Sequence, residues 1–287
     1  MKRFKNVFVS TTFADDDSKI SKVLKLCKKE NITNIELGSN HIYEENFEKI
    51  IEKFNFNFMI HNYFPIPRKS FVVNIASLNK DIRDLSLQHI KKSISFCKNT
   101  NSKLYTFHPG MVGDPMRASR SKKNYDFIWR KKIIQNYKLA FNNMMNSLKK
   151  IVDFAEKKNV KIAIETVGSF KRKAFGVMQR PYEYEKLFKH FNPKNLGINL
   201  NIGHLNLASK AFKFSRKKFV EYIEDYIVAV ELSHNNGKED EHLPIKKNAW
   251  YWKILKKKKF ATVPIILEYR NCKISTIKKS IQLLNNS

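Results

Sequence analysis

Six runs of β-branched or aromatic residues end in a side chain that can bind a metal ion. The side chains that close or directly follow these runs are His61, His108, Glu165, His204, His234 and Glu268. Asp240 and His242 come shortly afterwards and are two positions apart, so both can point the same way from an extended segment. Imidazole and carboxylate ligands without thiolate suit Zn²⁺, Mn²⁺, Co²⁺ or Fe²⁺.

The two glutamates are the hardest of these residues to explain without a metal. A single histidine at the end of a strand is most often an ordinary core or surface residue. Glu165 and Glu268, however, close the apolar runs Val-Lys-Ile-Ala-Ile and Val-Pro-Ile-Ile-Leu. Burying a carboxylate there is costly unless a cation or hydrogen bonds compensate its charge. The recurrence of such residues at six run ends therefore predicts a divalent metal site.

These runs alternate with longer amphipathic stretches, which is typical of βα units on a parallel sheet. The predicted strands are Asn6–Thr11, Asn34–Leu37, Asn57–His61, Lys103–His108, Val160–Thr166, Leu196–Leu200, Ile227–His234 and Val263–Glu268. Helical periodicity marks Asp81–Asn99 and Asn136–Lys158, and Tyr251–Lys259 and Ile274–Leu284 complete the series. No Gly-x-Gly-x-x-Gly follows the first run, so we predict a closed (β/α)₈ TIM barrel of the α/β class.

The length of the chain agrees with a barrel. Its 287 residues are close to the usual size of about 250 residues for this fold. The segments Gly110–Arg130 and Gly168–Arg180 are long and polar and follow predicted strands. Loops in that position build the active site of such barrels. We therefore expect a single domain over residues 1–287 with its site at the carboxyl ends of the strands.

The net charge of +29 allows more than one interpretation. It suits a polyanionic partner such as nucleic acid, or a small phosphorylated or acidic substrate. However, Lys outnumbers Arg 45 to 10, which is the composition expected of an AT-rich genome, whereas recognition of phosphates and bases favours Arg. Nucleic acid is therefore a possible but less favoured partner.

The compartment is predicted from the cysteines and from the lack of apolar segments. Cys27, Cys97 and Cys272 are scattered and odd in number, so they indicate neither a disulfide framework nor a Cys-x-x-Cys metal site. No secretory signal and no run of about 18 apolar residues is present, so we expect no membrane span. A cytoplasmic location is the simplest interpretation, and the oligomeric state stays open.

At this point the chain resembles the xylose-isomerase-like TIM barrel superfamily. This superfamily includes the sugar (phosphate) isomerases and epimerases and the endonuclease IV type of apurinic-site nuclease, also called AP endonuclease family 2. The resemblance runs from Asn6 to Tyr269. It is carried by Phe-His-Pro-Gly at 107–110, Ile-Glu-Thr at 164–166, Asn-Ile-Gly-His at 201–204 and Ser-His-Asn-Asn-Gly-Lys-Glu-Asp-Glu-His-Leu-Pro at 233–244.

The resemblance also implies groups of metal ligands. In nuclease-like members three zinc ions are bound, and the corresponding groups here are His61, His108 and Glu165; Glu165, Asn201, His234 and Glu268; and His204, Asp240 and His242. In epimerase-like members the second group alone holds one metal ion, and its two glutamates act as acid and base. The family usually has Asp at position 201, so Asn201 is expected to weaken the central ion. One to three ions are therefore expected.

Three functions follow from these observations. The first is a metal-dependent isomerase or epimerase acting on a sugar, a sugar phosphate or a related polyol, in which Glu165 and Glu268 move a proton. Arg180 and Arg270 could bind a phosphate or carboxylate of that substrate. The alternatives are a metal-dependent phosphodiesterase acting on abasic DNA, where Tyr63 could contact the substrate, and a non-catalytic ligand-binding barrel.

Overall fold

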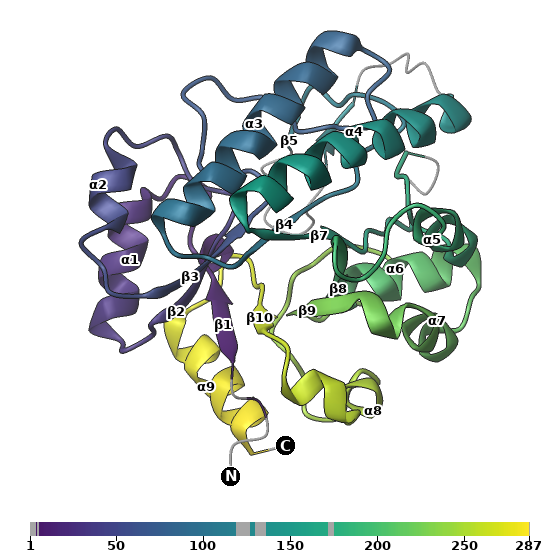
Figure 1. Ribbon diagram of the computed structural model, residues 1–287. Helices are drawn as coiled ribbons and strands as arrows, with labels where there is room; N and C mark the ends of the chain where they lie inside the picture. Colours follow the sequence, from purple (N-terminus) through teal and green to yellow (C-terminus); the bar gives the residue numbers. More distant parts are fainter. Residues whose placement is uncertain (1–3, 5, 119–126, 130–135, 172–174, 287) are drawn as a thin grey trace.

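Eight parallel strands close into a barrel in the order β1-β10-β9-β8-β7-β4-β3-β2. Read in the opposite direction around the barrel, this is the order of the strands along the chain. The computed structural model describes residues 4, 6–118, 127–129, 136–171 and 175–286 (Figure 1). The barrel strands are β1 Val7–Ser10, β2 Asn34–Leu37, β3 Asn57–His61, β4 Leu104–Phe107, β7 Lys161–Glu165, β8 Leu196–Asn201, β9 Ile227–Leu232 and β10 Ile265–Leu267. The predicted (β/α)₈ barrel is thus confirmed.

Helices follow the strands and form the outer layer of the barrel (Figure 1). They are α1 Ile20–Lys29, α2 Phe47–Ile51, α3 Lys80–Asn99, α4 Tyr137–Lys158, α5 Pro181–Phe188, α6 Ile202–Phe212, α7 Arg216–Ile223, α8 Trp252–Leu255 and α9 Ile274–Asn285. The side chains of Asn79 and Asn136 cap α3 and α4 by accepting hydrogen bonds from backbone N–H groups of the first turn. The antiparallel pair β5 Arg117–Ala118 and β6 Phe127–Ile128 lies in the loop after β4.

One predicted helix is shorter than expected. The segment Tyr251–Lys259 forms α8 for only one turn, and Lys258–Ala261 is a 3₁₀ helix. Four consecutive lysines begin at Lys256 and place like charges next to one another, which disfavours a longer helix. The chain instead turns so that Phe260 is fully buried before β10 begins.

The alternation of side chains along the strands divides the inside of the barrel into two layers. The lower layer is apolar and packs Phe8, Met59, Leu104, Ala163, Ala229 and Ile266 together. The residues two positions further along the same strands point the same way because the strand period is two. They form a buried polar layer of Ser10, His61, Thr106, Glu165, Glu231 and Glu268. Asn199 and Asn201 of β8 and Glu36 of β2 join it.

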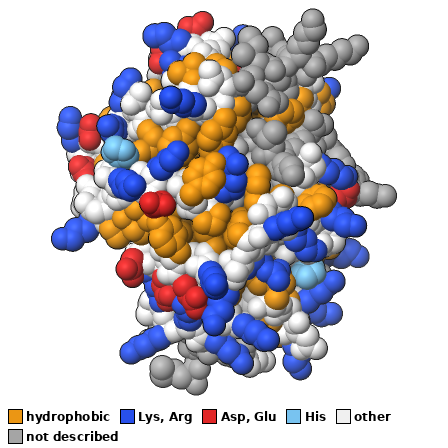
Figure 2. All heavy atoms as spheres, turned by 90° about the vertical axis from the view of Figure 1, so that its right-hand side faces the viewer, with side chains coloured by type: hydrophobic (Ala, Val, Ile, Leu, Met, Phe, Trp, Pro, Cys, Tyr) orange, Lys and Arg blue, Asp and Glu red, His pale blue; other side chains and the backbone are white. Residues whose placement is uncertain are grey.

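The outer surface is rich in basic side chains. On the face shown in Figure 2, Lys and Arg side chains are scattered over the surface, and hydrophobic side chains gather near its middle. Among the residues that the structure describes, no helix has the length and apolar character that a bilayer crossing requires. The carboxyl end of α9 lies near the amino end of β1 (Figure 1), at the end of the barrel opposite the carboxyl ends of the strands.

Candidate metal centre and active site

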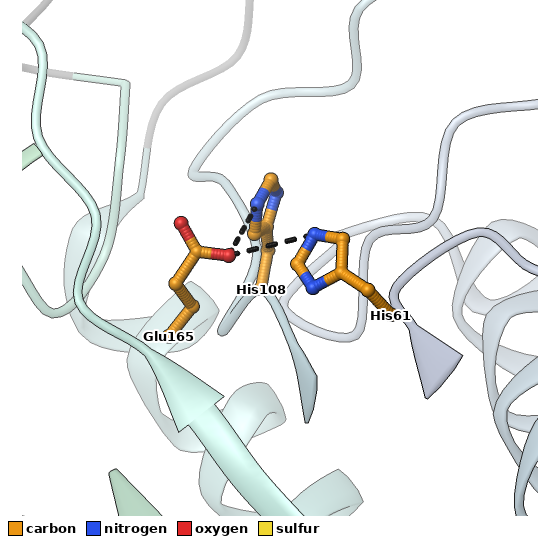
Figure 3. Close-up of side chains that lie close together, drawn as sticks. All are labelled: His61, His108 and Glu165. Atoms are coloured by element: carbon orange, nitrogen blue, oxygen red, sulfur yellow. Dashed lines mark ion pairs between the residues drawn. The ribbon is translucent and has the colours of Figure 1, made fainter. Parts of the chain in front are cut away.

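The first cluster of ligand side chains comes from the ends of three adjacent strands. His61 is the last residue of β3, His108 follows β4, and Glu165 ends β7. The Nε2 atoms of His108 and His61 lie 3.1 and 3.6 Å from the same oxygen, Oε2 of Glu165, and Figure 3 shows both rings pointing toward it. One ligand atom from each residue lies within 4.8 Å of the other two. This is the spacing that a single cation bound between them requires.

The second cluster consists of His204, Asp240 and His242. Both histidines point Nε2 at Oδ2 of Asp240, at 3.1 and 3.0 Å. Their Nδ1 atoms lie 3.1 Å from the carbonyl oxygen of Thr166 and 3.3 Å from that of Glu268. A carbonyl can only accept, so a neutral ring there keeps its proton on Nδ1 and leaves the Nε2 lone pair for a metal. This second contact is the usual arrangement of metal-binding histidines.

A local backbone feature supports the second cluster. His242 has a φ of 46°, which is in the left-handed region that side chains with a Cβ rarely adopt. Such conformations are costly and concentrate at functional sites. Here the conformation brings the side chains of both Asp240 and His242 to His204.

The centre between the two clusters does not fit a metal ligated by Asn201. Its Oδ1 accepts a hydrogen bond from the backbone N–H of His204, 3.0 Å away, and so caps α6. Its Nδ2 must then face inward, where it donates to Glu165 Oε1 and Glu231 Oε2 at 2.9 Å and to Glu268 Oε2 at 3.3 Å. An amide N–H₂ cannot ligate a cation. Three carboxylates therefore converge on a hydrogen-bond donor at this place.

His234 does not join these clusters in the structure. Strand β9 ends at Leu232. Side chains alternate between the two faces of a strand, so with Glu231 pointing inward, His234 three positions later is directed outward. The His234 ring is half-buried against Tyr251, with 6.2 Å between ring centroids. Its backbone pairs with that of Leu243. Glu231 occupies the inward position on β9.

Two buried carboxylates of the polar layer, Glu36 and Glu231, were not predicted from the sequence. Both are completely buried. Each lies inside a strand rather than at its end, in Asn-Ile-Glu-Leu and Ile-Val-Ala-Val-Glu-Leu. The sequence signal for both residues was a charged residue within an apolar strand run. Both faces of a barrel strand are covered, so such a charged side chain is buried whichever way it points.

The surroundings divide the four glutamates of the polar layer into two kinds. Burial alone would raise the pKa of Glu165, but the charges of His108 and His204 and their hydrogen bonds hold it well below its usual range. Burial is likewise outweighed at Glu268, whose pKa is lowered by His242. Burial and the neighbouring carboxylates raise the pKa values of Glu36 and Glu231 well above that range. The surroundings thus favour the ionised form of Glu165 and Glu268 over that of Glu36 and Glu231.

A cavity opens above the polar layer. Its walls combine the aromatic rings of Phe127, Trp129, Phe170 and Phe175 with the polar groups of Asn40, Asn62, Gln179, Lys171, Lys238 and Arg270. The ligand-type residues that reach it are His61, His108, His204, Asp240, His242 and Glu268. Glu165 is only 1% exposed and is not among the residues that line the cavity. Glu268 is therefore the glutamate that faces the cavity.

Both loops expected to build the site contribute to the cavity. Gly110 and Met111 of the first loop and Gly168 and Gly176 of the second line its walls. Within these loops, residues 119–126, 130 and 172–174 lie outside the described residues.

The three residues predicted to bind substrate have different positions. Arg270 lines the cavity, and its Nη2 is 2.7 Å from Oδ2 of Asp16. Tyr63 is not among the residues lining the cavity; its hydroxyl accepts a hydrogen bond from the backbone N–H of Phe71. Arg180 is also absent from the lining and packs over aromatic rings at the start of α5, including that of Tyr182. Of the three, the structure brings only Arg270 to the site.

Fold and site together define a TIM barrel with imidazole–carboxylate clusters at the carboxyl ends of its strands. The sequence model of the family described as xylose isomerase-like TIM barrel matches residues 13–286, and the chain belongs to this family. Over 251 residues the chain is 26% identical to the uncharacterized protein MJ1311 of Methanocaldococcus jannaschii. The matched stretch covers 86% of this chain and 76% of that protein.

Two further similarities concern proteins with named activities. The crystal structure of a D-tagatose 3-epimerase-like protein matches 98% of both chains with a TM-score of 0.71 and 22% identity, which shows a shared fold. A stretch of 78 residues is 33% identical to apurinic-apyrimidinic endonuclease 1 of Plasmodium falciparum; it covers 27% of this chain and 12% of that enzyme.

Proposed function

We propose that this protein is a metal-dependent isomerase or epimerase that acts on a sugar, a sugar phosphate or a related polyol. The observation that carries the proposal is the position of Glu268. It is an ionised carboxylate that faces the cavity, and His242 Nδ1, in the second cluster, lies 3.3 Å from its Oε2. The structural similarity to a D-tagatose 3-epimerase-like protein agrees with this class of reaction.

The two histidine clusters would hold the metal, with His61, His108 and Glu165 on one side and His204, Asp240 and His242 on the other. When bound, a divalent ion there polarises the carbonyl–hydroxyl unit of the substrate. Within the chain, Glu268 removes the proton from one face of the substrate carbon. Its return to the neighbouring carbon gives an isomer, and return of a proton from the opposite face by the second carboxylate, Glu165, gives an epimer. Glu165 also binds the metal.

The cavity walls fit a sugar-like substrate. Aromatic rings such as those of Trp129 and Phe175 can pack against the apolar face of a sugar ring, and amide groups such as those of Asn62 and Gln179 can hydrogen-bond to its hydroxyls. The guanidinium of Arg270 adds a positive charge for a phosphate or carboxylate group. This combination selects small polar molecules with a hydrophobic face.

Proton exchange between substrate and solvent is the direct test. In D₂O with added Mn²⁺, Co²⁺ or Zn²⁺, we expect the wild type to incorporate deuterium into one or more members of a ketohexose and ketopentose panel. Glu268→Gln should lower that rate by about 10²-fold or more, which is typical for loss of a general base. Glu241→Gln, in the adjacent loop, is the matched control. Exchange that persists unchanged in Glu268→Gln would refute the role of this residue.

The local match to an apurinic-apyrimidinic endonuclease favours one second candidate, a metal-dependent phosphodiesterase acting on abasic DNA. Both histidine clusters would serve such chemistry, since two bound ions can activate water and stabilise the leaving oxygen. Incubation of a labelled duplex that contains one abasic site with protein and Zn²⁺ or Mn²⁺ tests it. Cleavage that is lost in His108→Ala would favour this candidate, whereas an intact duplex would remove it.

A further inference from the structure

Below the two clusters, three buried side chains converge inside the barrel. Glu36 comes from β2, His61 from β3 and Glu231 from β9. One ligand atom of each lies within 4.8 Å of the other two. The exposed fractions are 0%, 2% and 0%, and of the three only His61 also lines the cavity. We call this group the deep cluster.

Three oxygens at the deep cluster, from Glu36 and Asn199, lack a good hydrogen-bond partner. Neither carboxylate oxygen of Glu36 has one, although the Ser10 hydroxyl lies beside it. Asn199 donates its Nδ2 to Oε1 of Glu231 at 2.6 Å, while its own Oδ1 is buried without a partner. Buried polar atoms are almost always satisfied. The unsatisfied acceptors here are oxygens, and a cation is the partner that satisfies several oxygens at once.

The amide of Asn201 does not supply the missing partner for Glu36. Its Nδ2 donates to Glu165, Glu231 and Glu268, and its Oδ1 caps α6. The Nδ1 atom of His61 lies 2.8 Å from Thr106 Oγ1 and 3.5 Å from Glu231 Oε1, and its Nε2 faces Glu165 Oε2. His61 therefore lies between the deep cluster and the cluster that lines the cavity. A neutral imidazole has one lone pair, so His61 can bind a cation through each nitrogen at the same time only as an imidazolate bridge.

We propose that Glu36, His61 and Glu231 form a separate, deeper cation site, with Asn199 Oδ1 as a further oxygen ligand. The ligand set is rich in oxygen, with two carboxylates and an amide carbonyl beside one imidazole. Such a set suits a hard divalent cation such as Mn²⁺ or Mg²⁺ better than a soft one. The two clusters at the cavity contain more imidazole and suit Zn²⁺ or Co²⁺. The ion in the deep site neutralises carboxylates and takes no direct part in the reaction.

The number of Mn²⁺ ions bound per chain tests the deep site independently of any activity. Full-length protein stripped with chelator is dialysed against Mn²⁺, and bound metal is measured by elemental analysis and by electron paramagnetic resonance. We expect Glu36→Gln to bind one Mn²⁺ fewer than the wild type. The same change at the exposed Glu48 of α2 should leave the number unchanged. Equal Mn²⁺ numbers for Glu36→Gln and the wild type would overturn the proposal.

A second pair of variants assigns the lost ion to the deep site. His108→Ala combined with His242→Ala removes ligands from both clusters at the cavity but leaves Glu36, His61 and Glu231 in place. This double variant should retain one Mn²⁺ per chain, and adding Glu36→Gln should remove it. Thermal unfolding of the metal-free proteins guards against misfolding, because Glu36→Gln removes an unpartnered carboxylate and should not lower Tm. A double variant that binds no Mn²⁺ while folded would also overturn the proposal.

Discussion

At the scale of single residues, Asn201 decides the chemistry of the barrel centre. Its carboxamide has one acceptor, used to cap α6, and one donor group, directed at three carboxylates. An aspartate would also cap the helix, because Asn and Asp are about equally good at that position. It would, however, bring a further negative charge in place of the donor. The centre of this protein is therefore held together by hydrogen bonds where an aspartate would require a cation.

Replacing Asn201 by Asp should make the centre depend on metal. Without metal, we expect the free energy of unfolding to fall by about 3 kcal/mol, the usual effect of an uncompensated buried charge. Saturating Mn²⁺ or Zn²⁺ should restore stability and add one bound ion per chain. Thermal unfolding and elemental analysis measure both effects. Asn142→Asp on the exposed face of α4 is the control. An unchanged Tm in chelator would contradict this view of the centre.

The second cluster should give the metal-free protein a characteristic pH dependence. Burial opposes charge on all three groups, but their mutual attraction lowers the pKa of Asp240 and raises those of His204 and His242 well above the usual range. The stabilisation from Asp240 is present above its unfolded pKa of about 3.9 and is lost in acid. That from the histidines is present below their unfolded pKa of about 6.5 and is lost as pH rises through the folded values.

The cluster therefore contributes most to the stability of metal-free protein between about pH 4 and about pH 6.5. Bound Zn²⁺ should remove the loss of stability on the alkaline side, because the metal and the proton compete for the same Nε2 atoms of His204 and His242. Tm measured across pH 4–9 with chelator and with Zn²⁺ tests this expectation. Parallel curves in the two conditions would show that the cluster does not bind the metal.

At the scale of elements, α5 holds the second cavity loop in place through Glu183. This residue is buried in the first turn of the helix, and its two oxygens accept hydrogen bonds from the backbone N–H groups of Met178 and Arg180 at 3.0 and 2.6 Å. Met178 has a φ of 61°, so the loop adopts a conformation that needs support. Gln179, next along the chain, lines the cavity. The start of α5 thus positions part of the cavity wall.

Glu183→Gln should loosen this wall. Glutamine has one acceptor oxygen, so its amide nitrogen would face one of the two backbone donors and leave it unsatisfied. We expect a loss of about 1–3 kcal/mol in the free energy of unfolding and faster hydrogen exchange over residues 175–183. Glu185→Gln, two residues along on the exposed side of α5, is the control. Wild-type exchange in this segment of Glu183→Gln would argue against the role of Glu183.

Burial raises the pKa of Glu183 to about 7, which gives the same interaction a pH signature. A carboxyl whose pKa is higher in the folded than in the unfolded state destabilises the fold as it ionises, between its unfolded pKa and about 7. The Tm of Glu183→Gln, which cannot ionise, should therefore fall less than that of the wild type from pH 4.5 to pH 7.5. An identical slope in both proteins would contradict this assignment.

At the scale of the whole molecule, the net charge of +29 and the barrel mouth are separate features. Basic side chains are scattered over the face in Figure 2, and four carboxylates lie in the polar layer. General attraction to polyanions is therefore expected from the surface charge alone. Binding of this kind weakens steeply with salt because it depends on counterion release.

Duplex DNA with and without an abasic site should therefore bind equally, and binding should fall by at least about 10-fold between 50 and 200 mM salt. Fluorescence anisotropy with the two duplexes measures it, and heparin serves as a polyanion without bases. A preference for the abasic duplex that persists at 200 mM salt would contradict this expectation and would favour the nuclease candidate.

The sequence by itself determined the barrel and the set of residues at its mouth. Hydrophobic runs of strand length alternating with amphipathic stretches define βα units, and barrel topology gathers every strand end at one place. This is why His61, His108, Glu165, His204 and Glu268 could be predicted from their positions at or just after strand ends. The tertiary structure decided which way each side chain points, since one position of uncertainty in the end of a strand exchanges the inner and outer faces.

This uncertainty about strand ends explains why some residues lie elsewhere in the structure than the sequence predicted. His234 was assigned to the centre because β9 was expected to reach it, whereas the strand ends at Leu232 and directs Glu231 inward. Glu36 had a signal in its place within an apolar run. The hydrogen bonds of Asn201 could not be predicted, because they join side chains of three other strands whose inward direction is fixed only in the closed barrel. Residue type and spacing therefore identify a barrel mouth lined by candidate metal ligands, while the direction of side chains inside the barrel determines which of them lie together.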